Sequence, residues 1–302
     1  MREIIIVPTF QRSELLYCCL EAIRQADPIA EVHVFPDRGT KELDVCNKFG
    51  ATHHLTFVHG YHGNSFNVCE ALKWASTQAP ATVYVVEDDA IIDKTFFSWC
   101  RTALVKFPQA FAACGWKYSP DAIIGTWSAP DMLLAWYLSV CAALPWSSVQ
   151  SIAQHARPDY YENMKDYLDK AYPTSTKRGT QHFEQDGLCY RVMESESKRC
   201  VWPRLPRATH VGYHGYHQGG KALEGTFEER VYLTKLAIKK PGILATLMNG
   251  GSTLRMGRCS TCKALLAVDR QDLTAICSEC FHSKHPNLAV TSDSHYYLGK
   301  GA

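Results

Sequence analysis

The sequence predicts an α/β fold, with a mostly parallel central sheet flanked by helices and a small metal-binding module near the C-terminus. Three observations predict it. Short β-branched runs alternate with segments of helical period over the first hundred residues, the connections between them are short, and the composition becomes cysteine-rich beyond the stretch MNGGST at 248–253. Alternation of this kind places successive strands in parallel, because each helix returns the chain to the same edge of the sheet.

Each element follows from a local pattern. Apolar, β-branched runs closed by proline or polar residues predict buried strands, and apolar residues three and four positions apart predict helices. We expect Ser13 to cap the first helix and Gly50 to end the second. The predicted strands are 2–10, 31–37, 53–59, 81–89 and 110–116. The predicted helices are 13–26, 41–50, 64–76 and 93–107.

The remaining sequence is less regular. Residues 118–185 are rich in aromatic side chains, and two tyrosine-rich helical segments are expected between 158 and 172. The expected domains are 1–247, with halves at 1–117 and 118–247, and a separate module at 254–290.

The overall charge gives no reason to expect a nucleic acid or membrane partner. The 302 residues are 46% hydrophobic and 21% charged, with a formal net charge of +2. The charge is uneven, however, because the band from Lys198 to Lys240 holds nine Lys or Arg against three Glu and no Asp. Such a basic band favours a polyanionic partner.

The sequence predicts a cytoplasmic protein without a membrane segment. No apolar run reaches 18 residues, the closest being 132–146, and no signal peptide is visible. Nine of the 13 cysteines are scattered through apolar or helical surroundings, so we expect them to be reduced and buried.

Three acids close the fourth predicted strand. Glu87, Asp88 and Asp89 follow VYVV, and clustered carboxylates repel one another and resist desolvation. Ligands of parallel sheets bind at the carboxyl ends of the strands, and carboxylate oxygens suit Mg²⁺ or Mn²⁺. The alternative is that the acids cap the next helix and face water. The segments PTFQR and FPDRGT, which close the first two strands, suit a nucleotide and favour a nucleotide–metal site.

Several of these segments resemble one enzyme family. IIIVPTFQRSELLYCCLEAI, VHVFPDRGT and VYVVEDDAIIDKTFFSWC are similar to the nucleotide-sugar half of GT-A fold glycosyltransferases, especially the N-acetylglucosaminyltransferase I family. HFEQDGLCYRVMESESKRCVWPRLPRATHVG resembles a later segment of that family. The resemblance covers about 1–115 and 180–215 and leaves the middle unmatched.

The resemblance implies a GT-A fold, a UDP-sugar donor and a set of site residues. The implied roles are metal binding for Asp89, contact with the ribose and donor sugar for Glu87 and Asp88, contact with uracil for Asp37, contact with the nucleotide for Thr9 or Arg12, and general base for Asp186. Two positions depart from the family pattern, which carries a tryptophan where Gln185 stands and an acid where Gly187 stands. One base and one Lewis acid are what a single displacement with inversion requires. Without the resemblance, Asp186 reads as a solvated helix residue.

Histidines and glycines cluster after the last of these segments. RATHVGYHGYHQGG at 207–220 holds three histidines and four glycines, which favours a functional loop over three structural histidines. His210 or His214 is expected to bind the metal or the phosphates. His59 and His62 are weaker candidates of the same kind.

Four cysteines near the C-terminus predict a structural Zn²⁺ site. Cys259, Cys262, Cys277 and Cys280 form C-x₂-C-x₁₄-C-x₂-C, the ligand spacing of a zinc ribbon. Two disulfides are the alternative, and His282 or His285 could replace a cysteine. Zinc ribbons bind nucleic acids or proteins, and the fold alone does not decide between them.

These features together predict a metal-dependent, inverting glycosyltransferase. The zinc ribbon and the basic band fit a phage-type enzyme that glycosylates 5-hydroxymethylcytosine, or a related hydroxymethylated pyrimidine, in DNA. Such an enzyme has to extrude its target base, on which Trp116, Tyr118 or Trp127 could stack. One alternative is a UDP-sugar transferase acting on a protein, a glycan or a small molecule. The other is a non-catalytic module that binds nucleic acid.

Overall fold

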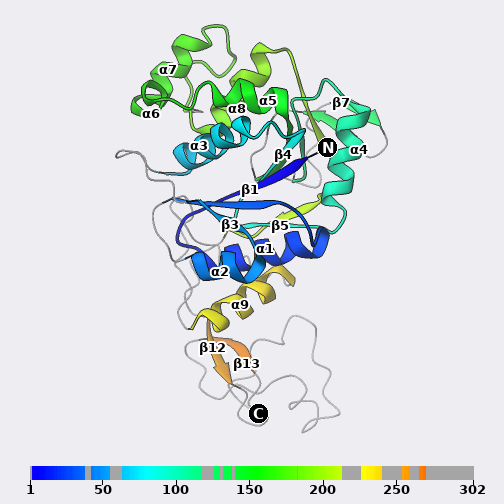
Figure 1. Ribbon diagram of the computed structural model, residues 1–302, viewed down its shortest axis with the longest axis vertical. Coiled ribbons are helices and arrows are strands. Elements are labelled where there is room, and N and C mark those ends of the chain that lie inside the picture. The colour runs from blue at the N-terminus through cyan, green and yellow to red at the C-terminus, as the bar shows by residue number, and fades with distance from the viewer. Residues whose placement is uncertain are drawn as a thin grey trace. The chain divides into compact units, whose positions relative to one another are not determined.

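The chain forms two compact units, residues 1–210 and 211–302. The computed structural model in Figure 1 describes 2–37, 42–54, 63–116, 126–129, 132–135, 137, 140–181, 183–212, 226–239, 254–258 and 265–269.

The first unit is built on a nine-stranded sheet. Its strand order is β3-β2-β1-β4-β9-β6-β10-β8-β7. The strands are β1 Glu3–Thr9, β2 Val32–Pro36, β3 Thr52–His53, β4 Thr82–Val86, β6 Ala112–Cys114, β7 Thr126–Ala129, β8 Met132–Ala135, β9 Cys141–Pro145 and β10 Cys200–Pro203. The parallel arrangement of β3, β2, β1 and β4 confirms the prediction for the first hundred residues.

The second half of the sheet is mixed. Strand β9 enters between β4 and β6 and is antiparallel to both, so β6 does not continue directly from β4. Strand β10 is parallel to β6 and antiparallel to β8. The apolar stretch 132–146 therefore supplies two strands, and no helix in the described part of the chain is long and apolar enough to cross a membrane.

Helices cover both faces of this sheet. Figure 1 shows α3, α5 and α8 on one side of the sheet and α1 and α2 on the other. The helices of the first unit are α1 Ser13–Ala26, α2 Leu43–Phe49, α3 Asn64–Thr77, α4 Phe96–Lys106, α5 Trp146–Ala153, α6 Pro158–Glu162, α7 Met164–Ala171 and α8 Gln185–Ser195. The short α6 and α7 are the two tyrosine-rich segments that the sequence predicted.

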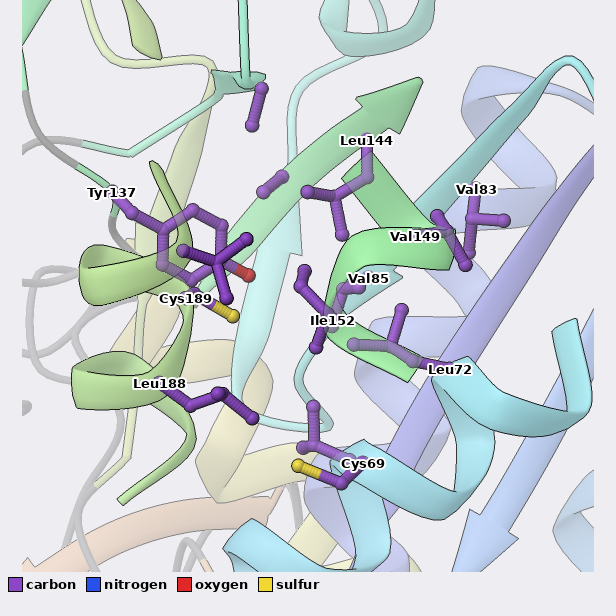
Figure 2. Packing of buried hydrophobic residues seen from close by; sticks show 14 of the residues in the cluster. Cys69, Leu72, Val83, Val85, Tyr137, Leu144, Val149, Ile152, Leu188 and Cys189 are labelled. Atoms are coloured by element: carbon purple, nitrogen blue, oxygen red, sulfur yellow. The ribbon is translucent and has the colours of Figure 1, made fainter. Parts of the chain in front are cut away.

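The main core lies between the sheet and the layer of α3, α5 and α8. Val83 and Val85 point from β4 toward Leu72 of α3 and Val149 of α5, and Leu188 of α8 closes the cluster (Figure 2). These side chains are buried because alternate residues of a strand face the same side of the sheet. Two-sided burial explains why the strands read as continuous apolar runs.

The opposite face has its own aromatic core. Tyr84, which alternates with Val83 and Val85, packs edge-on against Phe96 and Phe97 of α4, with ring centroids 5.9 and 4.9 Å apart. Nine cysteines among the described residues are buried, which confirms the expectation that these side chains pack in the core.

Two local predictions were imprecise at the ends of elements. Ser13 is the first residue of α1, and the capping position is held by Arg12, whose side chain makes no capping hydrogen bond. Strand β4 ends at Val86, so the three acids lie beyond it in a turn. Gly50 ends α2 in the left-handed conformation, with φ 59°, as predicted.

The second unit contains one helix and one hairpin among its described residues. Helix α9 spans Phe227–Lys239, and the antiparallel strands β12 and β13 span Leu254–Arg258 and Leu265–Asp269. Cys259 and Cys262 fall between these two strands in the sequence. All four cysteines of the predicted zinc site lie outside the described residues.

Candidate functional site

The acidic turn lies at the carboxyl edge of the parallel strands. The register of β1 and β4 pairs Ile6 with Val85, which brings Thr9 level with Asp88. On the other side of β1, the backbone N–H of Asp37 donates to the carbonyl of Thr9 at 2.8 Å. The ends of β2, β1 and β4 therefore meet at one edge, where open parallel sheets bind ligands.

A sharp turn after β1 returns Arg12 to this edge. Gln11 has φ 51°, in the left-handed region that non-glycine residues rarely adopt. The turn lets the side chain of Arg12 reach across to the acids that follow β4. A strained backbone at this position indicates that the surrounding contacts determine the conformation of the turn.

Asp88 is the centre of a buried ion pair. It is fully buried and accepts a hydrogen bond from the Thr9 hydroxyl at 2.6 Å. Nε of Arg12 donates to Oδ2 of Asp88 at 3.1 Å, and Nη2 donates to Oδ1. Burial raises the pKa of Asp88, while the charge of Arg12 opposes this shift. The sequence predicted that Thr9 or Arg12 contacts the nucleotide and that Asp88 contacts the ribose or the sugar. In the structure, Thr9 and Arg12 both bind the carboxylate of Asp88.

Asp89 is paired with a histidine far away in sequence. Strand β5, Ala90–Ile92, pairs antiparallel with β11, Ala208–His210, and this register sets His210 opposite Ala90. His210 Nε2 is 3.4 Å from Asp89 Oδ2, and Arg12 Nη1 donates to the same oxygen at 2.8 Å. Although burial opposes both charges, this pairing lowers the pKa of Asp89 and raises the pKa of His210.

The donor set at Asp89 fits a hard divalent cation. Its second oxygen, Oδ1, is buried and has no hydrogen-bond partner in the described structure, although Oδ2 has two basic neighbours. Among the described residues, no group of three His, Cys, Asp or Glu side chains could hold a metal alone. Mg²⁺ is commonly held by one or two carboxylates together with substrate phosphates and water. Asp89 supplies one such carboxylate and half-buried Glu87 lies near it, whereas His210 could join them only in its neutral form, because an imidazolium has no free lone pair.

Asp37 follows β2 at this edge, and Asp186 follows Gln185, which is hydrogen-bonded to Ser65 at the start of α3. The carboxylate of Asp37 accepts a hydrogen bond from the backbone N–H of Gly63, which precedes α3, at 2.6 Å. Asp186 lies in the first turn of α8 and is exposed, as a general base that meets an acceptor must be. Gln185, where the family pattern has a tryptophan, is buried.

The sequence did not single out three elements of this edge. Ser65 and Asn67 in the first turn of α3 read as ordinary helix residues, and only their position after a loop at the sheet edge could have drawn attention to them. The pairing of β5 with β11 joins segments more than a hundred residues apart and has no local signal. His214, His59 and His62 lie outside the described residues.

Within the first unit, the described part of the basic band divides between two edges of the sheet. Lys198 and Arg199 precede β10 and lie at the edge of the sheet opposite the acids, whereas Arg204 and Arg207 follow that strand. Arg207 Nη1 donates to the Thr95 hydroxyl at 3.1 Å. Within the first unit, the part of the band that lies on the candidate-site side is therefore the segment between β10 and β11.

The fold and site define a doubly wound α/β protein with an acidic ligand edge. No protein-family model and no curated protein matches the chain. Solved structures are similar to it over much of its length. TarS 1–349 from S. aureus, in complex with UDP-GlcNAc, is 15% identical, with 82% of this chain and 72% of that chain covered and a TM-score of 0.47.

Two further structures show the range of these likenesses. The galactosyltransferase LgtC, in complex with donor and acceptor sugar analogues, is 10% identical over 66% of this chain and 72% of that chain, with a TM-score of 0.39. The 4-diphosphocytidyl-2C-methyl-D-erythritol synthase from Anaerococcus prevotii is 10% identical over 79% of this chain and 96% of that chain, with a TM-score of 0.42. At TM-scores below 0.5, these likenesses carry no argument about the activity of this chain.

Proposed function

We propose that this protein is a metal-dependent, inverting glycosyltransferase that moves a sugar from a UDP-sugar to a hydroxyl group. The observation that carries the proposal is that Asp37, Asp89 and His210 lie at the carboxyl edge of the parallel strands, with one buried oxygen of Asp89 unpartnered among the described residues, and that Asp186 follows Gln185, which is bonded to Ser65 at the start of α3. A nucleotide site, a cation site and an exposed base on one edge are the parts that such a transfer requires.

Asp89 and His210 would hold Mn²⁺ or Mg²⁺. When bound, the cation would neutralise the charge that develops on the departing diphosphate. Arg12 and Thr9 hold the carboxylate of Asp88, which is fully buried, and half-buried Glu87 in front of it would contact the ribose or the sugar. Asp37 would accept a hydrogen bond from uracil, with its carboxylate oriented by the N–H of Gly63.

Asp186 would remove the proton from the acceptor hydroxyl. It lies in the first turn of α8, and a helix N-terminus is a favourable place for a carboxylate. With the base on the acceptor side and the leaving group on the opposite side, a single displacement inverts the anomeric carbon. The proton passes to Asp186 as the new glycosidic bond forms and the bond to the diphosphate breaks.

For the acceptor, we propose a hydroxymethylated pyrimidine in DNA, such as 5-hydroxymethylcytosine, modified in the cytoplasm of a phage-infected cell. Arg204 and Arg207 follow β10 on the candidate-site side of the sheet, where they could meet phosphates. The Trp116 ring lies edge-on to His210, with centroids 5.6 Å apart, and offers a surface for an extruded base. A protein, a glycan or a small molecule is the alternative acceptor, and a non-catalytic nucleic-acid-binding module is the alternative to an enzyme.

Release of UDP distinguishes an active enzyme from a non-catalytic binding module. Wild-type protein with Mn²⁺ is incubated with a panel of UDP-sugars, and UDP is quantified. We expect Asp89→Ala to abolish turnover, and Asp186→Asn to keep nucleotide binding by calorimetry while losing turnover at least a hundredfold. Asp166→Asn is the matched control, because Asp166 is also an exposed acid in the first turn of a helix, α7. Absence of UDP release with every donor would rule out the enzyme.

The acceptor is tested by mass spectrometry of DNA. Matched duplexes and single strands, with and without 5-hydroxymethylcytosine, receive the donor that is turned over fastest. Sugar should appear only on the hydroxymethylated base. If UDP is released but neither DNA gains sugar, or both gain it equally, the acceptor proposal fails while the transferase proposal stands.

We further propose that Cys259, Cys262, Cys277 and Cys280 bind a structural Zn²⁺. The antiparallel pairing of β12 and β13 supports this, because a hairpin that brackets the first cysteine pair is how a zinc ribbon presents its ligands. Such a small segment has little core of its own, so metal would hold it together. One equivalent of zinc per chain is expected by elemental analysis, and removal of 254–302 should weaken DNA binding more than UDP release.

A further inference from the structure

The start of α3 is hydrogen-bonded to the end of β2. The carboxylate of Asp37 accepts the N–H of Gly63 at 2.6 Å, and the side-chain amide of Asn67 donates to the carbonyl of Phe35 at 2.5 Å. Asp37 and Asn67 are both buried. The first turn of α3 therefore has a fixed position relative to the strand end that would read the uracil.

The same turn of α3 is hydrogen-bonded to the first residue of α8. The Ser65 hydroxyl donates to Oε1 of Gln185 at 2.8 Å and accepts the backbone N–H of Gln185 at 3.2 Å. Ser65 and Gln185 are only 7% and 5% exposed, so water does not replace these bonds readily. The Ser65 hydroxyl thus donates one hydrogen bond to Gln185 and accepts another from it, so the two bonds are reciprocal.

Ser65 thus acts as a capping residue supplied by another helix. The first N–H groups of a helix lack partners within the helix, and a side chain normally accepts from one of them. Glu184, which holds the capping position of α8, makes no side-chain capping hydrogen bond. The N–H of Gln185 is satisfied by Ser65 of α3 instead, which fixes the first turn of α8 where Asp186 lies.

We propose that Ser65 and Gln185 are positioning residues for Asp186. They hold the acceptor base at a set distance from the donor site through the first turn of α3. This inference rests on the proposed function, because it concerns the base of that reaction. A helix turns by about 100° per residue, so a small rotation of the first turn of α8 would swing an exposed aspartate away from the acceptor. Neither residue touches the substrate in this scheme.

A purely structural role predicts a different result. If the pair only stabilised the fold, its loss would lower the melting temperature and the amount of active protein, with kcat per folded molecule unchanged. A positioning role predicts a fall in kcat with the donor KM unchanged, because donor binding and base alignment are separate.

The test measures UDP release, with water as acceptor, from the UDP-sugar that the wild type turns over fastest. Ser65→Ala and Gln185→Met should each lower kcat at least tenfold and leave the donor KM within twofold. The double variant should be no worse than the more impaired single variant, since both changes break one pair. Ser65→Thr, which keeps the hydroxyl, should retain at least a third of the wild-type kcat. Ser151→Ala, which removes an exposed hydroxyl bonded to its own helix, is the matched control.

The outcomes separate the two proposals. No UDP release by wild-type protein overturns the proposed function and this inference with it. An active wild type with unchanged kcat in folded Ser65→Ala and Gln185→Met overturns the positioning role alone. So does a fall in kcat that is matched by a rise in donor KM, or an equal fall in Ser65→Thr. Melting curves of each variant establish that folded protein is compared.

Discussion

Removal of the guanidinium from Arg12 should destabilise the first unit strongly, whether or not a ligand is bound. Asp88 is fully buried and accepts three hydrogen bonds, two from Arg12 and one from Thr9. Arg12→Met keeps the aliphatic stem but leaves a buried carboxylate with one neutral partner. Breaking a buried ion pair on one side costs about 3–5 kcal/mol. We expect a loss of that size in the free energy of unfolding.

The assay is urea unfolding followed by tryptophan fluorescence, in buffer with EDTA so that no cation contributes. Arg101→Met is the matched control, because Arg101 pairs with Glu3 on the surface and is 48% exposed. It should cost less than about 1 kcal/mol. The double variant Arg12→Met/Asp88→Asn should recover at least about 2 kcal/mol relative to Arg12→Met alone, since the uncompensated charge is gone. Equal losses for Arg12→Met and Arg101→Met would refute the reasoning.

Two further stability predictions follow from packing and from a histidine pair. Gly115→Ala should cost about 1–3 kcal/mol by chemical denaturation, because the added Cβ would overlap the Phe96 ring; a cost near zero would show that the ring can move aside. His54 stacks on Phe35, and Nε2 of its ring is 2.8 Å from Nδ1 of His33, so one ring must stay neutral. Burial lowers the pKa of His54 to about 4, so the unfolded chain takes the proton first and stability should fall by about 1–2 kcal/mol as the pH drops from 6.5 to 4. His54→Phe should flatten that fall in unfolding experiments across this range, and an unchanged pH dependence would contradict the assignment.

The local pattern of the sequence was enough to predict the parallel half of the sheet. β1, β2 and β4 are buried on both faces over most of their length, so their residues are mostly apolar, and this pattern can be recognised without tertiary information. The same reasoning placed Glu87, Asp88 and Asp89 at the ligand edge, because clustered acids cannot continue a buried strand. The antiparallel insertion of β9 was not predicted, because partner choice depends on contacts that local pattern does not contain.

In the candidate site, too, the local pattern predicted some features and tertiary contacts determined the others. The local pattern singled out the acidic cluster that contains Asp89, and His210 as one of two candidate histidines, whereas Asp37 and Asp186 were implied only by the family resemblance. It did not reveal that Arg12 turns back to pair with Asp88, since this depends on the register of β1 and β4 and on the left-handed turn at Gln11.

What the sequence by itself determined is the set of elements and the chemistry available at their ends, because burial and helical period act on neighbouring residues. Only the tertiary structure decided which groups meet. His210 reaches Asp89 through the pairing of β11 with β5, and Ser65 meets Gln185 through the packing of α3 on α8. Contacts of this kind join residues more than a hundred positions apart, and their geometry is fixed by the whole core and not by the residues on either side.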